Sequence, residues 1–356
     1  MLHNFPLIKS LVRLPTPPNI SYFWNFRSTI GFFLIIQILT GLFLTIHYTA
    51  HTDTAFLSIV HIINDINNRY MIRYCHCNRA SFFILFIYLH IFRGIYYKRF
   101  SNIHAWIARV SLLGLSIGTA FLRYVLPWRQ ISYWGATVIT NLVSAIPYVR
   151  ESIVFWLWGR FSVDLPTLNR FYTFHFILPF VISFLSVIHL LLIHEKRSRN
   201  PLGFYSSIKL DFWPFFRIKD ILRFFFFIRI FFFIIFYTPE IFSDPDNYIK
   251  ANSLVTPQHI KPEWYFLFAY AILRCIPDKL IRVIALVISI LIFFFLPFYN
   301  NKLKISFIYQ SIFFFWLFNL IILTWLRRCP VKDIFTYISQ ISRILYFFLL
   351  FMIPFL

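Results

Sequence analysis

Four histidines occupy matched positions in two apolar segments of the chain. The interval from His76 to His90 in the second predicted membrane span equals the interval from His175 to His189 in the fourth. Because an α-helix has about 3.6 residues per turn, each interval spans roughly four turns, so each pair lies on one face of its helix, about 21 Å apart along the axis. Only one span separates the two helices, so they run in the same direction and the pairs are level. The spacing therefore predicts two stacked bis-imidazole sites inside a helical bundle.

The spacing favours haem or metal sites, because a neutral imidazole nitrogen is a good axial ligand for haem iron. A transporter whose intramembrane histidines relay protons is the alternative. Zinc fits less well, because no clustered cysteines or carboxylates complete a ligand set. The four cysteines show neither C-x-x-C nor C-x-x-C-H spacing, so nothing indicates covalent haem attachment. Arg73 and Arg93 each lie three residues from a histidine, where a guanidinium either pairs with a haem propionate or extends to the membrane interface.

The composition indicates which elements must position these histidines. Hydrophobic residues make up 59% of the 356 residues and charged residues 13%, against roughly 25% charged in soluble chains. A water-soluble domain cannot bury so much apolar surface, so the chain is predicted to be an integral membrane protein. Eight segments are long and apolar enough to span a membrane: about 29–48, 76–97, 106–126, 171–194, 221–238, 281–299, 305–326 and 336–356.

The predicted fold is all-α, a polytopic membrane protein with eight transmembrane helices. Its first four spans form a haem-binding four-helix bundle, residues 1–200, and the last four form a C-terminal membrane domain, residues 201–356. Lys and Arg in the N-terminal segment and in the connection 195–220 place both on the matrix or cytoplasmic side. The long connections 127–170 and 239–280 are then expected to lie together on the opposite face.

The excess of basic residues does not indicate nucleic-acid binding. The chain has 34 Lys and Arg against 13 Asp and Glu, a formal net charge of +21. These basic residues are spread among apolar spans, and no aromatic–basic sheet motif accompanies them. Loop charge that sets the membrane topology is the favoured interpretation.

Four motifs accompany the histidine pairs: WGATVITNLVSAIP at 134–147, FHFILPF at 174–180, DPDNY at 244–248 and KPEWYFLFAYAILR at 261–274. With them, nearly the whole chain resembles mitochondrial cytochrome b, the central subunit of the cytochrome bc complex (respiratory complex III). The continuous chain and the equal histidine spacings favour the respiratory form over the photosynthetic relative, which is split in two. The resemblance implies a subunit of ubiquinol–cytochrome c reductase. It would oxidise quinol in a bifurcated reaction at an outer site, pass electrons through two non-covalent b haems and reduce quinone at a matrix-side site.

The resemblance also implies how the haems are held. His76 and His175 would ligate the low-potential haem near the outer face. His90 and His189 would ligate the high-potential haem near the matrix. Gly41 would let a helix backbone pack closely against a haem, and the two arginines named above would pair with haem propionates.

At the outer site, the resemblance implies that Glu263 accepts a proton from quinol and that Tyr124, Gly135, Pro262 and Tyr265 line the pocket. A quinol that loses two electrons must also lose two protons, so a titratable group has to reach its hydroxyl. An aromatic-rich stretch desolvates a carboxyl, and desolvation raises its pKa. Without the motif, Glu263 would be interpreted as an interfacial carboxylate in a solvated loop.

At the matrix side, the resemblance implies that His194, Asp220, Lys219, Ser198 and Ser28 lie near the quinone ring. His194 and Asp220 can both donate and accept protons, as quinone reduction requires. In the alternative interpretation, His194 is a surface histidine and Asp220 is an N-terminal aspartate that interacts favourably with the dipole of the fifth helix.

The resemblance implies partners and a location as well. These are the Rieske iron–sulfur protein, a membrane-anchored c-type cytochrome and other complex III subunits, in a homodimeric complex of the mitochondrial inner membrane. The chain has no iron–sulfur centre or c-type haem motif, so it is not expected to act alone. Proton release outside and uptake inside would couple the reaction to proton translocation. A polytopic proton-coupled transporter and a divergent, non-catalytic structural subunit are the alternatives.

The chain departs from the family pattern at a set of arginines. It has 8 Gly, about 2%, against about 7% in typical chains. Arginine stands where the family pattern has glycine at Arg27, Arg79, Arg123, Arg129 and Arg160, and further cases are Arg109, Arg150, Arg197, Arg223, Arg282, Arg327 and Arg328. Family glycines that match Arg27, Gly41, Arg109 and Arg123 let a helix backbone approach the porphyrin.

We hypothesise that these arginines are glycine codons translated under the wrong code, because some animal mitochondria read AGA and AGG as glycine. The low Met count of 3 agrees, since such codes also read AUA as Met instead of Ile. The alternative is a divergent gene whose product binds haem poorly.

Overall fold

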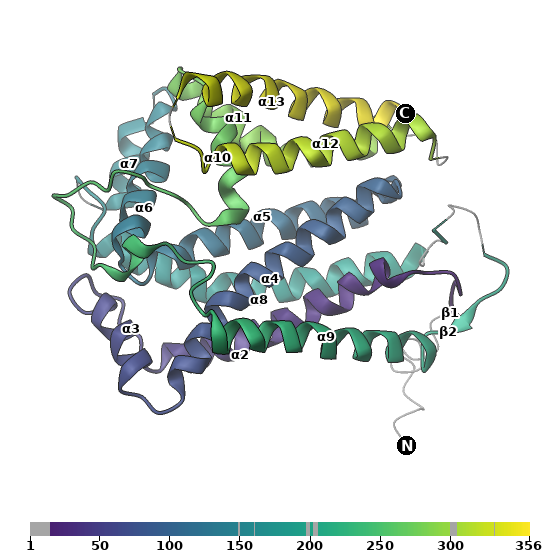
Figure 1. Ribbon diagram of the computed structural model, residues 1–356, viewed down its shortest axis with the longest axis horizontal. Helices are drawn as coiled ribbons and strands as arrows, with labels where there is room; N and C mark the ends of the chain where they lie inside the picture. Colours follow the sequence, from purple (N-terminus) through teal and green to yellow (C-terminus); the bar gives the residue numbers. More distant parts are fainter. Residues whose placement is uncertain are drawn as a thin grey trace.

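A computed structural model describes residues 15–148, 150–159, 161–196, 200–201, 206–299, 305–330 and 332–356. The described residues are almost entirely helical, which confirms the predicted all-α class (Figure 1). The α-helices are α2 (Phe26–Thr45), α3 (Ala55–Asn64), α4 (Arg69–Tyr96), α5 (Ile103–Val125), α6 (Gln130–Leu142), α7 (Arg150–Trp158), α8 (Leu165–Lys196), α9 (Phe215–Tyr237), α10 (Leu267–Arg274), α11 (Lys279–Leu291), α12 (Phe307–Leu326) and α13 (Asp333–Met352). Two short strands, β1 (Pro15–Thr16) and β2 (Leu210–Asp211), pair antiparallel.

Seven helical segments of the described residues are long and apolar enough to cross a membrane: Tyr22–Thr45, Arg69–Tyr96, Ile103–Val125, Leu165–Glu195, Lys279–Phe298, Phe307–Leu326 and Asp333–Phe355. The fifth predicted span corresponds to α9, which is not one of the seven. It has 23 residues, but Asp220, Arg223 and Arg229 interrupt its apolar sequence. It nevertheless packs against α2 and α4, parallel to the spans (Figure 1).

The first four spans form two closely packed pairs, α2 with α4 and α5 with α8, and α4 also contacts α5. Of these helices, α4 is largely buried, whereas α2 and α8 expose much of their apolar surface. The later spans form a second layer, in which α10 packs against α11 and α12, and α12 packs against α13 (Figure 1). Because α5 returns between them, α4 and α8 run in the same direction, as the sequence predicts.

The two ends of the helices carry different loops. One end carries α3, α6, α7 and the segment 239–263, and the other carries β1 and β2 (Figure 1). Pro15 and Thr16 pair with Asp211 and Leu210 of the connection 195–220, as the predicted grouping requires, whereas Lys9 and Arg13 lie outside the described residues. The predicted grouping of the connections 127–170 and 239–280 at one end of the helices is confirmed.

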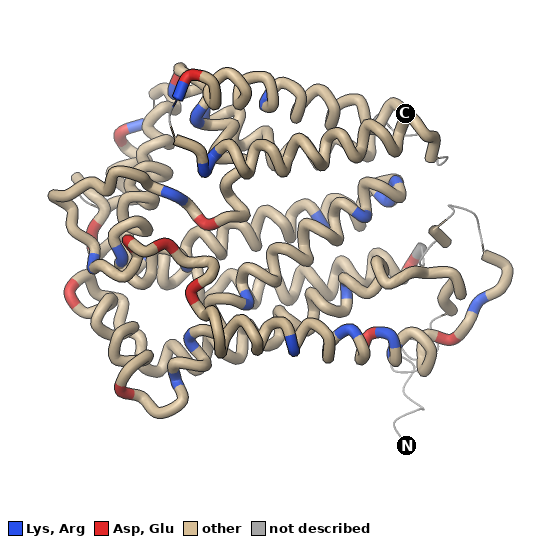
Figure 2. The backbone as a smooth tube through the Cα atoms, in the orientation of Figure 1, with Lys and Arg blue, Asp and Glu red and all other residues tan. Residues whose placement is uncertain are grey.

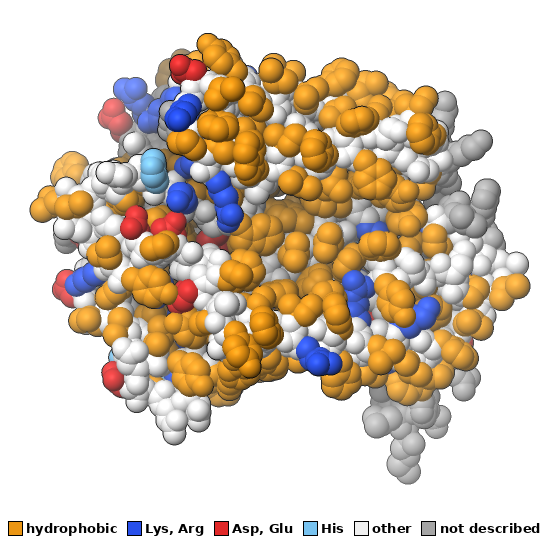
Figure 3. Space-filling view, in the orientation of Figure 1, with side chains coloured by type: hydrophobic (Ala, Val, Ile, Leu, Met, Phe, Trp, Pro, Cys, Tyr) orange, Lys and Arg blue, Asp and Glu red, His pale blue; other side chains and the backbone are white. Residues whose placement is uncertain are grey.

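The outer surface of the helices is apolar, as a lipid-facing surface requires. Apolar side chains cover most of the face seen in Figure 3. Phe184, Phe225 and Phe315 are exposed by 67%, 63% and 65%, a large cost in water but none in hydrocarbon. Lys and Arg nevertheless occur along the helices as well as at their ends (Figure 2).

Candidate functional site

The four histidines form two pairs between α4 and α8. The ring centroids of His76 and His175 are 6.3 Å apart with an interplanar angle of 89°. Those of His90 and His189 are 6.5 Å apart with an angle of 83°. His76, His90 and His189 are buried and His175 is partly buried. The pairing predicted from the equal spacing is therefore confirmed.

Neighbouring helices orient the outer pair. Nδ1 of His175 donates to the backbone oxygen of Thr119 at 3.1 Å, and Nδ1 of His76 lies 3.0 Å from the hydroxyl of Thr40. A hydrogen bond at Nδ1 sets the ring orientation and leaves Nε2 as the ligand atom. The amide nitrogen of Gln37 lies 3.4 Å from Nε2 of His76. The amide of Gln37 donates to the backbone oxygen of His76 at 2.9 Å and joins α2 to α4.

A cavity of about 150 Å³ adjoins the outer pair. Its walls include both imidazoles, Gly41, Arg73 and Arg123, and most of its other lining side chains are apolar. Gly41 backs directly onto His76, because a Cβ at this position would lie 3.1 Å from Cε1 of the imidazole. A larger residue at position 41 would therefore displace His76.

Arginines surround the inner pair. Nη2 of Arg93 lies 3.4 Å from Nδ1 of His90, which places a cation directly beside this imidazole. The guanidinium of Arg109 interacts electrostatically with both His90 and His189. It lies 5.1 Å from the ring centroid of Trp106, and Arg109 is only 8% exposed. The inner imidazoles thus share a buried space with cations.

Arg79 and Arg109 are buried and have no carboxylate partner among the residues that the structure describes. Nε and Nη1 of Arg109 make no hydrogen bond there, and the same atoms of Arg79 make none either. The guanidinium of Arg79 lies 4.6 Å from the ring centroid of Phe231, near the middle of α4. An unpaired cation at a helix centre costs roughly 2.5–3.5 kcal/mol or more in a bilayer. These positions are therefore energetically unfavourable for arginine.

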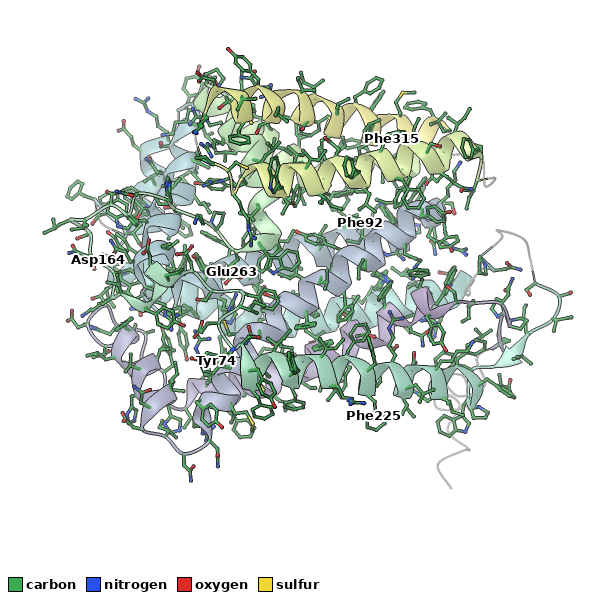
Figure 4. All side chains as sticks on the ribbon, viewed as in Figure 1. Tyr74, Phe92, Asp164, Phe225, Glu263 and Phe315 are labelled. Atoms are coloured by element: carbon green, nitrogen blue, oxygen red, sulfur yellow. The ribbon has the colours of Figure 1, made fainter. Side chains whose placement is uncertain are left out.

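Glu263 precedes the short 3-10 helix Trp264–Phe266, which leads into α10 (Figure 4). Its carboxylate accepts hydrogen bonds from the guanidinium of Arg123 and from the hydroxyl of Tyr265. Burial raises the pKa of the Glu263 carboxyl, and the positive charge of Arg123 opposes that rise. The predicted proton acceptor is thus buried, but an arginine occupies one of its oxygens.

Tyr124 lies beside Gly135, where an added Cβ would be 3.8 Å from the tyrosine ring. The hydroxyl of Tyr124 accepts from the amide of Asn247 at 3.1 Å and donates to the backbone oxygen of Lys261 at 3.4 Å. The ammonium of Lys261 also lies 4.0 Å from a carboxylate oxygen of Asp244. Since Pro262 follows Lys261 directly, the structure brings the predicted outer-pocket residues together.

The segment that carries these residues is anchored on the start of α6. The backbone N–H of Gln130 donates to Ile249, and its side chain donates to the backbone oxygen of Val255 at 2.5 Å. The backbone N–H of Asn252 donates to the side-chain oxygen of Gln130 at 2.7 Å. Trp134 donates its indole N–H to the backbone oxygen of Asn252 at 3.2 Å. The predicted proximity of connections 127–170 and 239–280 is confirmed.

At the opposite end, Asp220 is buried at the start of α9. It accepts from the hydroxyl of Ser28 at 2.7 Å and from the amide of Asn25 at 2.8 Å. Arg27 interacts electrostatically with both Asp220 and His194. Three of the predicted matrix-side residues, Ser28, Asp220 and His194, therefore lie around Arg27.

Lys219 points away from this group toward aromatic rings. Its ammonium lies 5.4 Å from the ring centroid of Phe216 and 5.9 Å from that of Tyr22. Ser198, Arg160 and Arg197 lie outside the described residues.

Several polar residues of these sites were not singled out from the sequence: Gln37, Thr40, Thr119, Asn25, Asn247 and Gln130. Gln37, Thr40 and Gly41 follow each other at helical intervals, and so share one face of α2. Polar side chains on one face of an apolar span are a signal that could have identified them. Thr119 acts through its backbone oxygen, so its side chain gave no signal.

Two family models match the chain. One described as "Cytochrome b/b6/petB" matches residues 11–197, and one described as "Cytochrome b(C-terminal)/b6/petD" matches residues 250–347. The chain belongs to the cytochrome b family. It is also similar to a chain of a solved structure described as "Hyperthermophilic respiratory Complex III", with 28% identity and a TM-score of 0.92 over 99% of this chain and 97% of that chain. The family and this similarity show a respiratory cytochrome b core of an oxidoreductase complex.

Membership of the cytochrome b family implies b-type haem, and the two imidazole pairs fit it. A metal bound by two opposed imidazoles at about 2 Å from each nitrogen places the ring centroids about 6 Å apart. The observed separations of 6.3 and 6.5 Å agree with that requirement. The guanidinium groups of Arg109 and Arg123 beside these rings are the part of the site that does not suit a flat, apolar macrocycle.

Proposed function

We propose that this chain is the haem- and quinone-binding core subunit of a mitochondrial ubiquinol–cytochrome c reductase. The observation that carries the proposal is the pairing of imidazoles at two levels of one bundle, with centroid separations of 6.3 and 6.5 Å. Two pairs of histidines, each spaced to bind a metal ion between its rings, lie at two levels of parallel helices and are suited to electron transfer across a membrane. A proton relay does not require opposed imidazoles at that separation.

The outer pair holds one b haem and the inner pair holds a second. When bound, the haems supply reversible one-electron carriers that connect the two faces of the membrane. Arg73 lines the outer cavity and Arg93 contacts an inner imidazole, so each guanidinium is placed to pair with a propionate. Because Gly41 has no side chain, a haem bound to His76 can pack closely against the backbone of α2.

Quinol oxidation takes place on the outer side. Glu263 accepts a proton from a quinol hydroxyl at its carboxylate, and the buried position of that carboxyl suits the transfer. Tyr124 and Gly135, which lie in contact, line the pocket together with Pro262 and Tyr265. Pro262 restricts the backbone beside Glu263 and so limits where the carboxylate points.

Quinone reduction takes place on the matrix side. Asp220 and His194 deliver protons to the quinone oxygens, and Ser28 orients Asp220 through its hydrogen bond of 2.7 Å. The resemblance also implies Lys219 and Ser198 near the quinone, but the ammonium of Lys219 faces the rings of Phe216 and Tyr22, and Ser198 lies outside the described residues. Protons are thus released on one face and taken up on the other.

The subunit works within a larger assembly. A Rieske iron–sulfur protein docks on the outer loops, a membrane-anchored c-type cytochrome takes up one electron, and the complex is a homodimer in the mitochondrial inner membrane. Residues 1–200 form the haem-binding bundle and residues 201–356 the C-terminal membrane domain with the outer quinol loop.

The test is an optical and compositional analysis of the complex purified from its natural membrane. A reduced-minus-oxidised spectrum should show a b-type band, and extraction should release two protohaems per copy of this chain. The complex should also reduce cytochrome c with ubiquinol. Absence of protohaem from the complex would overturn the proposal and favour a transporter or a structural subunit.

A further inference from the structure

The two helices that flank the histidines repeat the spacing of each histidine pair. The interval from Arg109 to Arg123 on α5 equals that from His76 to His90, and so does the interval from Arg27 to Gly41 on α2. Gly41 faces the outer pair, because a Cβ there would meet the imidazole of His76 at 3.1 Å. The three arginines are therefore the counterparts of Gly41 at the two levels of the bundle.

At the outer level, Arg123 carries a long cationic side chain where its counterpart Gly41 carries none. Its side chain lines the same cavity as both outer imidazoles, although Arg123 is only 8% exposed. It also binds the carboxylate of Glu263. One side chain thus interferes with the cofactor cavity and with the proposed proton acceptor.

At the inner level, cations crowd together. Arg93 interacts electrostatically with Arg109, Arg27 and Arg99, and each of these interactions is between like charges. Nη1 of Arg109 would lie 2.5 Å from a Cβ at Gly94, so its guanidinium fills the space between α4 and α5. Like charges in a low-dielectric interior repel strongly. A haem carries two propionates, which suit one or two of these cations but not four.

We propose that positions 27, 109 and 123 carry glycine in the natural protein, because the mitochondria of its source read the codons AGA and AGG as glycine. The inference rests on the proposed haem sites. With glycine at these positions, α2 and α5 present bare backbone beside the imidazoles at both levels. Arg73 and Arg93 remain to pair with propionates, and the carboxylate of Glu263 loses its ion pair with Arg123 but keeps its hydrogen bond from Tyr265.

The composition favours glycine over serine as the alternative reading of these codons. Glycine is depleted to about 2%, whereas serine is three times as frequent and close to ordinary usage. The tight contact at Gly41 gives a steric reason as well, since a serine there would still carry a Cβ against the ring. The same reading also removes Arg79, whose Nε and Nη1 atoms are buried and make no hydrogen bond among the described residues. It removes Arg223 too, one of the charges that interrupt α9.

Peptide mass spectrometry of the natural protein tests the inference directly. Peptides covering α5 should contain glycine at positions 109 and 123, and a peptide covering the start of α2 should contain glycine at position 27. Arginine or serine at position 109 or 123 would overturn the inference. If those residues are arginine and the complex still contains two haems, the inference fails while the proposed function stands. Glycine in a complex without haem would instead refute the proposed function.

Variants of the complex expressed from a recoded gene give a second readout. The chain with arginine at every position in the printed sequence should retain less than one haem per copy. The double variant R109G/R123G should approach two, with sharper b-type bands. R229G is the matched control, because Arg229 is exposed on α9 and should leave haem content unchanged. Equal haem content in the arginine chain and the double variant would also contradict the inference.

Discussion

Arg123 and Glu263 form a buried ion pair between α5 and the segment that enters α10, although 140 residues separate them in the chain. The same guanidinium lines the cavity beside the outer histidines. A single side chain thus reaches both the cavity beside the outer histidines and the carboxylate of Glu263. In the proposed function, electron transfer from quinol and proton transfer to Glu263 would therefore take place within one small region.

The first prediction concerns the proton acceptor. Replacing Glu263 with Gln removes the carboxylate that takes up a proton, so quinol–cytochrome c reductase activity should fall on the order of 100-fold. Glu263→Asp, which keeps a carboxylate, should retain part of that activity. Unchanged turnover in the Gln variant would assign proton uptake to another residue.

The pH dependence of the reaction follows from the same group. Burial raises the pKa of Glu263, and a protonated carboxyl cannot accept a proton, so the rate should fall as the pH drops through that pKa. Arg123 lowers this pKa, so a chain with glycine at position 123 should lose activity at a higher pH than one with arginine. Rate profiles of the two forms measure the shift. A shift to lower pH would show that the ion pair does not control the carboxyl.

Separate loss of each haem is the third prediction. His76→Leu should remove the outer haem and His90→Leu the inner one, because each iron would lose an axial ligand. Extracted haem should fall from two to one per chain in either variant, and the two spectra should differ. His61→Gln is the control, because His61 is exposed and pairs with Asp65 at 2.7 Å instead. Two haems in the Leu variants would exclude these ligands.

The fourth prediction concerns Thr40, which contacts Nδ1 of His76 at 3.0 Å. Thr40→Val keeps the shape of the side chain but removes the hydrogen bond that orients the imidazole. Affinity for the outer haem should fall about 10-fold, and its midpoint potential should change. Thr324→Val should have no effect, since its hydroxyl bonds to the backbone oxygen of Leu320 within α12. Equal losses in both variants would indicate a general effect of removing a helix hydroxyl.

The last prediction separates the two quinone sites. Asp220→Asn should slow re-oxidation of the haems by quinone about 10-fold, while the first turnover of quinol oxidation is preserved. Stopped-flow spectroscopy of haem reduction and re-oxidation distinguishes the two phases. Asp211→Asn, on the exposed strand β2, provides the control. Slower haem reduction in the Asp220 variant would place the residue on the outer pathway.

Some features follow from the sequence alone, because they depend on local periodicity. The spacing of His76 and His90 sets their heights on one helix regardless of what surrounds it. The apolar segments predict the spans for a similar reason, since each backbone satisfies its own hydrogen bonds within a helix. The predicted span that is not among the seven apolar spans of the structure is α9, where Asp220 and Arg223 interrupt the apolar pattern.

Other features were decided only by the tertiary structure, because they join residues whose separation in the chain has no period. The contact between Thr40 and His76, the bond between Asn247 and Tyr124, and the pairing of Arg123 with Glu263 all depend on which helix faces meet. Periodicity specifies the height of a residue on a helix, but packing specifies its neighbours. The sequence places an arginine along the helix axis, but only the packed neighbours in the tertiary structure decide whether it is tolerated there.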